Sequence, residues 1–460
     1  MKVLKFGGTS VGSVARLRAL PALLPNDVPH IVVLSAMAGT TNALVQIAQL
    51  LTTGQPAAAA TQLDALRRHY HAVAEELLAG TAAVAATLAA LDACFDAVGA
   101  LAAQPLTPVG ERVILAQGEL LSTLLFHRYL TDVLGQPAVL LPALDFMRLD
   151  AQAEPAADYI ETQLTDLLSA HAGCQRFITQ GYICRDAEGS IANLRRGGSD
   201  YSASLIGAAI KASEIQIWTD IDGLHNNDPR VVAETYPVRE LSFDEAAELA
   251  YFGAKILHPS SVLPARQHGI PVRLLNTMEP EAPGTLISTR TGPAGIKAVS
   301  VKDGLVAIRV QSSRRLVAYD FLPRVFEAFR RHRTAIDMVT TSETGVSLTI
   351  DDATSLPAIL PELRELGEVA VTTGHSLVCV VGRQLVQEHY GLTCSIFSAL
   401  RGLPLHMICY GGSANNVSFL IDTADKVRAL RALHETVFQP WMQPSHLLLA
   451  AEEQLAKMLA

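Results

Sequence analysis

The first 290 or so residues alternate between short strand-like and longer helix-like segments, and this alternation most constrains the fold. Helical spacing of apolar residues is found, for example, over Leu115–Leu130 and Asp200–Ala212. Strands that alternate with helices form a mostly parallel sheet covered by helices, so this part is predicted to be α/β. The expected strands are Val3–Phe6, His30–Ser35, Ala138–Leu141, Arg176–Gln180, Ile215–Thr219 and Val272–Leu275.

An Ala-rich segment, 55–103, interrupts the alternation with apolar residues at helical spacing. It predicts a helical excursion from the sheet. Two interpretations are open, namely a cover over a ligand site and simple surface helices.

Beyond residue 295 the elements shorten and repeat. Pro280–Lys297 contains three prolines and three glycines, which indicates a linker with one last strand, Thr285–Ser288. Two units with the order β-α-β-β-α follow, at a period of about 70 residues, and this order is that of ferredoxin-like domains. The first is expected over Leu305–Val310, Leu322–Arg331, Ala335–Thr340, Val346–Ile350 and Leu356–Leu366, and the second over His375–Val381, Cys394–Leu400, Leu405–Tyr410, Asn416–Ile421 and Ala424–Val437.

These patterns predict four segments. An α/β domain covers 1–294, two ferredoxin-like units cover 303–370 and 373–439, and a tail covers 440–460. Within the tail, Ser445–Ala460 has the pattern of an amphipathic helix that docks on the protein.

Composition excludes several classes of protein. The net charge of −9 argues against a nucleic-acid partner, because such proteins carry a basic surface. The six cysteines form no CxxC pair, which indicates neither a zinc site nor a disulfide framework and favours a reducing cytoplasm. We expect no signal peptide, no apolar run long enough to cross a bilayer and no membrane partner.

The start of the chain predicts a phosphate-binding turn. Met1–Phe6 is largely apolar and runs directly into Gly7 and Gly8, with Lys5 just before the turn. Paired glycines after a buried strand bring backbone N–H groups close to a phosphate. This is not a P-loop, because the lysine precedes the glycines. Taken alone, an ordinary tight turn with a snorkelling lysine explains the same residues equally well.

Two segments downstream carry further polar groups. Leu34–Asn42 ends a strand with small residues and opens a helix, so its hydroxyls and amides can hold an anion or simply cap the helix. Glu119 lies within an apolar helical pattern, in GERVILAQGELLS, 110–122. It suits a substrate ammonium, and a partly exposed helix charge is the alternative.

Leu194–Ser202 reads LRRGGSDYS, in which two glycines precede Ser199 and Asp200 at a helix start. Guanidinium groups bind carboxylates through two parallel hydrogen bonds. Asp200 can accept from backbone N–H groups or orient a lysine. A capped helix with surface arginines explains the pieces but not the nine residues together.

Ile217–Leu224 is a strand that ends in an acidic turn, and Asn227–Arg230 follows it. Ligands bind at the ends of parallel strands, where Arg230 could neutralise a phosphate; an Asx turn with a solvated arginine is equally plausible. Lys255 lies in the segment 251–259, where a lone lysine is most simply a surface cation at a helix end. His258 is assigned no role.

Together these motifs resemble the aspartate kinases of the amino-acid kinase family. KFGGTSVG, LSAMAGTTN, GELLS, RRGGSDYSA, WTDIDG, DPR and FGAKILHP occur in the order and at the spacing of that family. The resemblance implies a carbamate kinase-like catalytic domain, and the tandem units resemble paired ACT domains that carry allosteric control. The single-function, lysine-sensitive type matches best, so we expect no homoserine dehydrogenase module.

The resemblance implies transfer of the ATP γ-phosphoryl group to the β-carboxylate of L-aspartate. The product, 4-phospho-L-aspartate, leads to lysine, threonine and methionine. The attacking carboxylate is already anionic, so catalysis consists of positioning and charge neutralisation. Lys5 is implied to contact the transferring phosphoryl group, Asp200 to orient Lys5, and Lys255 to contact the nucleotide phosphates. Mg²⁺ arrives with ATP, and no protein ligand to a metal is predicted.

The resemblance also implies the binding residues. Arg196 would hold the α-carboxylate of aspartate and Glu119 its ammonium. The remaining predicted contacts are Ser35, Thr41 and Ser199 for the substrate, and Gly7, Gly8, Thr219, Asp220 and Arg230 for the nucleotide.

For regulation, the resemblance implies that an amino acid, L-lysine, binds the first ACT unit of a homodimer or larger assembly joined through these units. The chain departs from the family pattern at His225, usually tyrosine, at Asp320, usually glycine, and at Arg315, usually uncharged. Asp320 could pair with a lysine ammonium or repel its α-carboxylate, and Arg315 could offset that repulsion. The implied effector residues are Asp320, Phe321, Leu322, Asp337, Thr341, Ser342 and Glu343.

Two alternative functions are compatible with parts of the sequence. A related kinase for glutamate, N-acetylglutamate, carbamate or UMP would share the phosphate end, but Arg196 with Glu119 and the regulatory units favour aspartate. A non-enzymatic amino-acid sensor would lack Lys5, Asp200 or Lys255, and all three are present.

Overall fold

The computed structural model describes residues 1–103, 105–194, 197–253, 259–290, 292, 295–312, 318–385 and 390–438. The chain folds into two compact units, one made of 1–224 with 257–290 and the other of 225–256 with 291–460. Residues 225–256 therefore group with the second unit, so these units are not the two parts on either side of residue 295. The four predicted domain boundaries stay a prediction, and the helix expected over Ser445–Ala460 lies outside the described residues.

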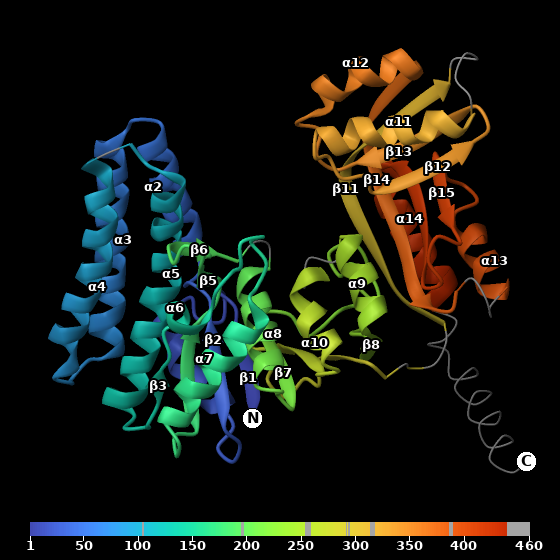
Figure 1. Cartoon of the computed structure of the whole chain (residues 1–460). Helices are drawn as coiled ribbons and strands as arrows, with labels where there is room; N and C mark the ends of the chain where they lie inside the picture. The colour runs from blue at the N-terminus through green and yellow to red at the C-terminus, as the bar shows by residue number, and fades with distance from the viewer. Residues whose placement is uncertain are drawn as a thin grey trace, which may run out of the picture. The chain divides into compact units, whose positions relative to one another are not determined.

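The first unit is built on a mostly parallel sheet, as predicted (Figure 1). Its strands follow the order β3-β4-β2-β1-β7-β9-β10, and only the β10–β9 pair among them is antiparallel. The bounds are β1 (Lys2–Phe6), β2 (His30–Leu34), β3 (Val139–Leu140), β4 (Arg176–Gln180), β7 (Glu214–Thr219), β9 (Val272–Asn276) and β10 (Thr285–Ser288).

The sheet is covered by helices, and a short antiparallel hairpin of β5 (Ile183–Arg185) and β6 (Ile191–Asn193) follows β4. Two irregular helical segments, η1 (Leu20–Leu23) and η3 (Tyr129–Val133), continue α1 and α5. The helices are α1 (Val14–Ala19), α2 (Thr40–Thr52), α3 (Pro56–Leu77), α4 (Ala83–Ala100), α5 (Pro108–Arg128), α6 (Ala143–Phe146), α7 (Ala157–Ala170), α8 (Gly198–Ala209) and α10 (Leu263–Gln267), the last preceded by η4 (Pro259–Val262).

Central strands of this sheet are largely buried because helices cover both faces. Val3, Leu4 and Phe6 of β1 are fully buried. Phe6 stacks on Trp218 of the neighbouring β7, with ring centroids 5.9 Å apart. This packing holds the carboxyl end of β1, and with it the following turn, in a fixed position.

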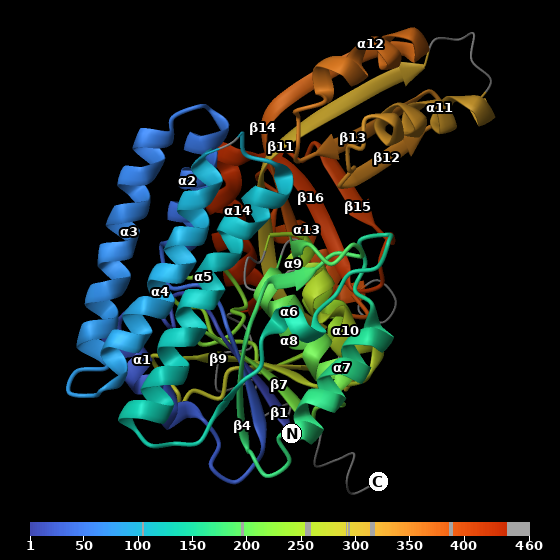
Figure 2. The same cartoon turned by 60° about the vertical axis from the view of Figure 1, so that its left-hand side comes forward.

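The Ala-rich segment forms the long helices α3 and α4, which lie side by side with α2 and α5 in both views (Figures 1 and 2). With the short η2 (Leu101–Ala103), α4 is long and apolar enough to cross a membrane by length and composition alone. This finding corrects the expectation that the chain has no apolar run of such length. In the fold, its Asp92 and Asp96 form ion pairs with Arg67 of α3. Leu91, Phe95 and Val98 of α4 are buried in the core of the first unit, where the helix packs against α3 and α5.

The second unit contains one antiparallel sheet with the order β12-β13-β11-β14-β16-β15 (Figure 2). A short strand, β8 (Glu240–Ser242), and a helix, α9 (Phe243–Tyr251), also belong to the second unit but not to this sheet. Ser242 and Glu245 form a capping box at the start of α9. The sheet strands are β11 (Gly295–Ser312), β12 (Met338–Ser342), β13 (Gly345–Ile350), β14 (Gly367–Arg383), β15 (Met407–Tyr410) and β16 (Asn416–Asp422). The other helices are α11 (Ala318–Arg331), α12 (Leu356–Leu366), α13 (Tyr390–Ala399), η5 (Thr423–Asp425), α14 (Lys426–Leu433) and η6 (His434–Phe438).

Two ferredoxin-like units are present, and the long strands β11 and β14 belong to both. β11 pairs with β14 from Gly295 to Ser312, while β13 pairs only with the second half of β11 and β16 only with the second half of β14. Each unit has its own apolar core. The predicted linker was wrong at its end, because residues 295–297 already belong to β11. Gly295 suggested a connecting segment, whereas pairing with β14 makes residues 295–297 part of a strand.

Candidate active site

The carboxyl ends of five parallel strands meet at one edge of the first sheet. In the register, Phe6 pairs with both Leu34 and Trp218, Leu34 with Gln180, and Trp218 with Leu275. Ligands bind at this edge in open α/β sheets. The residues just past these strand ends are small or polar, namely Gly7, Ser35, Gly181, Asp220 and Thr277.

A buried ion pair lies at this edge. The Lys5 Nζ atom is 2.7 Å from Oδ1 of Asp200, and the two side chains are only 11% and 15% exposed. Asp200 is in the first turn of α8, which begins after Gly197 in the left-handed conformation (φ 76°). The sequence predicted that Asp200 orients Lys5, and their separation is compatible with that role.

The glycine turn packs closely against the segment that follows β2. The Gly7 N–H donates to the Trp218 carbonyl at 3.1 Å, and the Ala38 N–H donates to the Gly8 carbonyl at 3.0 Å. A Cβ atom at Gly8 would lie 2.8 Å from the Ala36 carbonyl oxygen. Only glycine therefore fits at position 8 without displacing backbone.

Glu119 is a buried carboxyl group on α5, only 5% exposed. Its Oε1 atom accepts from the Ala36 N–H at 3.2 Å. Close packing of α5 places it there, because a Cβ at Gly118 would lie 2.7 Å from the Ala36 Cβ. Burial raises the pKa of Glu119 to about 8, although backbone hydrogen bonds and the Lys5 charge act in the opposite direction. A cation beside it would favour the ionised form.

Several neighbours of the predicted substrate residues had no assigned role. Ser122 Oγ donates to the Ser35 carbonyl at 2.8 Å, and the Thr40 hydroxyl lies 2.8 Å from that of buried Tyr70. Thr41, in the first turn of α2, is exposed. Ser122 stands in the GELLS motif, which was a usable signal, whereas Tyr70 reaches the site only through the folding of α3.

Other contacts link the strand ends to one another. A Cβ at Gly181 would lie 2.5 Å from the Ser199 Cβ, so the end of β4 touches the start of α8. Thr277 Oγ1 donates to the Thr219 carbonyl at 2.6 Å and lies 2.9 Å from Ser10 Oγ. Thr219 Oγ1 in turn donates to the exposed Asp220, at 3.1 Å. The sequence signal for Gly181 and Thr277 was their position just past the ends of two predicted strands.

Three of the residues predicted for the active site, Arg196, Lys255 and Arg230, are not brought to this edge by the described structure. Arg196 and Lys255 lie outside the described residues, as does Arg315 of the predicted effector loop. Arg230 belongs to the second unit, where its guanidinium, 82% exposed, is 2.7 Å from the Asp228 carboxylate. Hydrogen bonding to Arg230 lowers the pKa of Asp228.

The predicted effector residues lie in three places, namely the first turns of α11 and the two ends of strand β12. Ser342 and Glu343 lie at the tip of the β12–β13 hairpin, where Ser342 pairs with Gly345. The Ser312 N–H at the end of β11 donates to the Thr344 carbonyl, so this tip is close to the end of β11. Thr341 and Asp320 are exposed, whereas Phe321 and Leu322 pack in the apolar core of the first ACT unit.

Asp337 lies just before β12, at the other end of that strand. Its carboxylate is 2.5 Å from Nζ of Lys302, which is also 2.7 Å from Asp351, and the Asp337 side chain is only 3% exposed. The Lys302 ammonium lies over the Tyr251 ring, 5.4 Å from its centroid. Asp337 is thus already paired with a lysine of its own chain.

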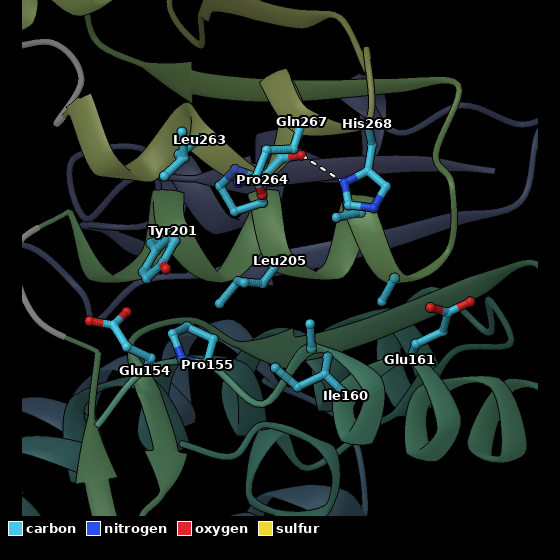
Figure 3. Close-up of a pocket in the computed structure, with 13 residues that line it drawn as sticks. Glu154, Pro155, Ile160, Glu161, Tyr201, Leu205, Leu263, Pro264, Gln267 and His268 are labelled. Atoms are coloured by element: carbon cyan, nitrogen blue, oxygen red, sulfur yellow. Dashed lines mark hydrogen bonds between the residues drawn. The ribbon is translucent and has the colours of Figure 1, made fainter. Parts of the chain in front are cut away.

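A cavity of about 260 Å³ in the first unit lies among α7, α8 and α10 (Figure 3). Its lining is largely apolar, with Leu205 and Ile160 facing each other and Glu154 and Glu161 toward its ends. Neither Lys5 nor Glu119 lines it. The chemistry therefore concentrates at the strand ends rather than in this cavity.

Comparison with known proteins agrees with this geometry. The amino acid kinase family matches residues 1–276, and an ACT domain matches 378–437. The chain is 34% identical to lysine-sensitive aspartokinase 3 of Escherichia coli (strain K12), with 95% of this chain and 99% of that protein covered. The crystal structure of E. coli aspartokinase III with aspartate and ADP (R-state) matches with a TM-score of 0.84 and 33% identity, over 95% of this chain and 100% of that chain. The structure of that enzyme with lysine and aspartate (T-state) matches with a TM-score of 0.79 and 33% identity, over 95% and 99%. The chain therefore belongs to the amino acid kinase family and, within it, to the aspartokinases.

Proposed function

We propose that this chain is an aspartate kinase that transfers the γ-phosphoryl group of MgATP to the β-carboxylate of L-aspartate, giving 4-phospho-L-aspartate. The observation that carries the proposal is the buried Lys5–Asp200 ion pair beside the Gly7–Gly8 turn. A related enzyme, at 33% identity, has been crystallised with aspartate and ADP. The reducing cytoplasm is the compartment proposed for this reaction.

Lys5 acts on the phosphoryl group. Both reactants are anionic, so their approach requires a fixed positive charge where negative charge concentrates in the transition state. Asp200, at 2.7 Å, holds the lysine ammonium in one place, so little reorganisation is needed during the reaction. The aspartate β-carboxylate is already ionised, and no group has to remove a proton from it.

Glu119 and Arg196 bind the two ends of the aspartate backbone. The ammonium of aspartate pairs with ionised Glu119, which supplies one buried charge complementary to one substrate charge. Arg196 holds the α-carboxylate through its guanidinium fork. Ser35, Thr41 and Ser199 lie toward the β-carboxylate end.

The nucleotide contacts involve backbone more than side chains. Gly7 and Gly8 let the backbone of the turn approach the phosphates, with the Gly7 N–H already donating to the Trp218 carbonyl, and Lys255 adds a positive charge there. Thr219 and Asp220 face the rest of the nucleotide, and a nucleotide contact of Arg230 stays a prediction from the sequence. Mg²⁺ enters as part of MgATP, and carboxylate oxygen such as that of exposed Asp220 is the donor type this ion prefers.

A substrate panel tests the proposed function. Release of ADP should depend on L-aspartate and should stay at background with glutamate, N-acetylglutamate, carbamate or UMP. Formation of an acyl phosphate, trapped with hydroxylamine, would identify the product. Equal turnover with glutamate would contradict the assignment of aspartate as the substrate.

Replacing Arg196 with lysine should raise the KM for aspartate by about tenfold or more and leave the KM for ATP nearly unchanged. Lysine keeps the charge but loses the two-pronged hydrogen bonding. The neighbouring Arg195→Lys variant is the matched control. Initial-rate kinetics with each substrate varied measure both constants, and a change confined to the KM for ATP would move Arg196 to the nucleotide side.

Regulation by an amino acid fits the second unit, and we propose L-lysine as the effector and a dimer through the ACT units. The related enzyme of E. coli is named lysine-sensitive and has been crystallised with lysine. Edge strand β15 exposes Ile408 and Tyr410, which supports pairing with a second chain. Asp320, Thr341, Ser342 and Glu343 offer polar groups to lysine in the first ACT unit.

Millimolar lysine is expected to inhibit ADP release, and Asp320→Gly should shift the half-inhibitory concentration by about threefold or more. Asp320 is an exposed charge in the first turn of α11, so it acts on the effector by pairing or repulsion. Tighter inhibition of the variant would indicate repulsion of the lysine α-carboxylate, and weaker inhibition would indicate pairing with an ammonium. Activity insensitive to lysine, with no heat of lysine binding, would contradict the proposal.

A further inference from the structure

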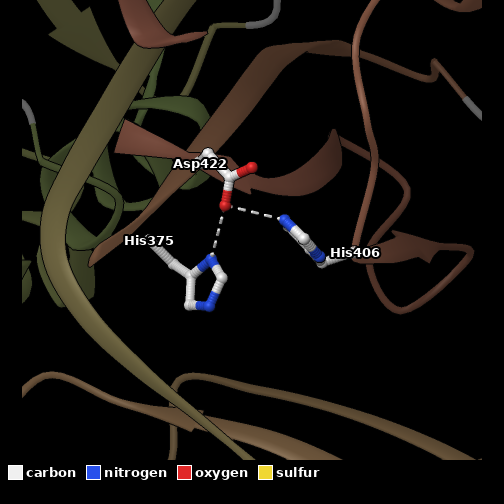
Figure 4. A group of neighbouring side chains, drawn as sticks. All are labelled: His375, His406 and Asp422. Atoms are coloured by element: carbon white, nitrogen blue, oxygen red, sulfur yellow. Dashed lines mark hydrogen bonds and ion pairs between the residues drawn. The ribbon is translucent and has the colours of Figure 1, made fainter. Parts of the chain in front are cut away.

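Three side chains with metal-binding atoms converge in the second unit, where the middle of β14 lies beside the end of β16 and the start of β15 (Figure 4). His375 lies on β14, Asp422 is the last residue of β16, and His406 directly precedes β15. His375 and Asp422 are register partners, and the backbone N–H of His406 donates to the Leu420 carbonyl at 2.8 Å. The strand order β14-β16-β15 therefore places the carboxylate between the two imidazoles.

Their spacing suits one small cation. The Asp422 Oδ1 atom lies 2.9 Å from Nε2 of His406 and 3.5 Å from Nδ1 of His375, and the three ligand atoms all lie within 4.8 Å of one another. Ligand atoms around a tetrahedral zinc ion are about 3.3 Å apart, given metal–ligand distances near 2.0 Å. The two separations from Asp422 lie on either side of that value, so an ion fits after small rotations of the exposed side chains.

His375 supplies the second observation that points to a ligand. The side chain is only 4% exposed, and its buried Nδ1 atom makes no hydrogen bond, the nearest polar partner being Asp422 Oδ1 at 3.5 Å. Its Nε2 atom lies 2.8 Å from Thr372 Oγ1. Gly374, between these two residues, has the left-handed conformation (φ 80°) and turns the chain so that they meet. In the tautomer in which Nε2–H donates to Thr372, the lone pair of Nδ1 faces the Asp422 carboxylate, and a cation bound between the two atoms would replace this repulsion with two metal–ligand bonds.

We propose that His375, His406 and Asp422 bind a divalent transition-metal ion of the Zn²⁺ class in the second ACT unit. Two imidazole nitrogens and one carboxylate oxygen favour Zn²⁺, Co²⁺ or Ni²⁺ over Mg²⁺ and Ca²⁺, which prefer oxygen ligands alone. The side chains of His406 and Asp422 are 40% and 44% exposed, which leaves the fourth coordination position to water. The bound ion links β14, β15 and β16.

Zinc binding to the full chain, freed of metal with a chelator, tests this site. Calorimetry and equilibrium dialysis with ZnCl₂ should give one tight site per chain in the wild type. His406→Asn should weaken it by about a hundredfold or more, and Thr372→Val, which removes only the acceptor for His375, by about tenfold. The matched control is His332→Asn, because His332 also pairs with a carboxylate (Glu362, 2.8 Å) in the same unit but is outside this cluster.

Two further readouts separate this site from adventitious binding. Co²⁺ should give the visible absorption of a nitrogen–oxygen site without a thiolate charge-transfer band, which excludes the cysteines as ligands. Zn²⁺ should raise the melting temperature of the wild type and of His332→Asn but not of His406→Asn. Wild-type zinc affinity in both His406→Asn and Asp422→Asn, a thiolate band with Co²⁺, or zinc binding absent from the wild type would overturn the proposal.

Discussion

Replacing Lys5 with methionine is expected to lower the turnover number for phosphoryl transfer by at least about a hundredfold. Removal of one preorganised charge from a site where negative charge develops has an effect of this size. Lys5 is the cation that the Gly7–Gly8 turn and Asp200 surround, and methionine keeps most of its aliphatic length. Coupled ADP-release assays at saturating MgATP and aspartate measure the change.

Lys2→Met is the matched control on the same strand. Lys2 is at the start of β1 and is 3.7 Å from Glu214, about 10 Å along the strand from Lys5. Its loss should leave turnover within about twofold, because a surface ion pair contributes little. Circular dichroism would establish that both variants are folded. Wild-type turnover in a folded Lys5→Met variant would remove Lys5 from the mechanism.

Aspartate binding is expected to weaken as the pH falls from 8 to 6, with KM rising by at least about tenfold. Burial raises the pKa of Glu119 to about 8, so acid converts this group to a neutral form that no longer attracts the substrate ammonium. The sign follows from linkage, since the substrate binds the ionised form and must displace a proton below the pKa. Initial rates at saturating MgATP across this pH range measure the effect.

Glu119→Gln should raise the KM for aspartate at pH 8 and abolish most of its pH dependence. Glu111→Gln, an exposed position on the same helix, is the control and should behave as the wild type. Because the native state holds the Glu119 proton more tightly than the unfolded chain, stability from this group is lost as pH rises from about 4.5 to 8. Without ligand at pH 8, Glu119→Gln should therefore melt at a higher temperature. An unchanged pH dependence in this variant would assign the titration to another group.

Local patterns were sufficient for most elements of both folds. The predicted strand Thr285–Ser288 matches β10 at both ends, and the expected helix Leu356–Leu366 matches α12. The spacing of apolar residues indicates which face of a helix or strand is buried, so it identifies individual helices and strands well. It does not report which strand a segment pairs with, and this is why residues 295–297 were taken for a linker rather than the start of β11.

The same division holds at the candidate site. Lys5, Gly7, Gly8, Glu119 and Asp200 were identified because glycine pairs, helix starts and charges in apolar patterns are local signals. Their sequence positions show that the residue types needed for phosphoryl transfer are present. The kinetic experiments on Lys5 and Glu119 test the roles proposed for these residues.

Tertiary structure decided what no local pattern contains. Tyr70 meets Thr40 because α3 packs beside α2, and Asp337 finds Lys302 across the second unit. His375, His406 and Asp422 come from separate strands and converge only through their register. Sequence alone determined the family, the alternation of elements and the inventory of reactive groups. The distances, the burial and therefore the raised pKa of Glu119 depend on packing between segments far apart in the chain, which a pattern of neighbouring residues does not encode.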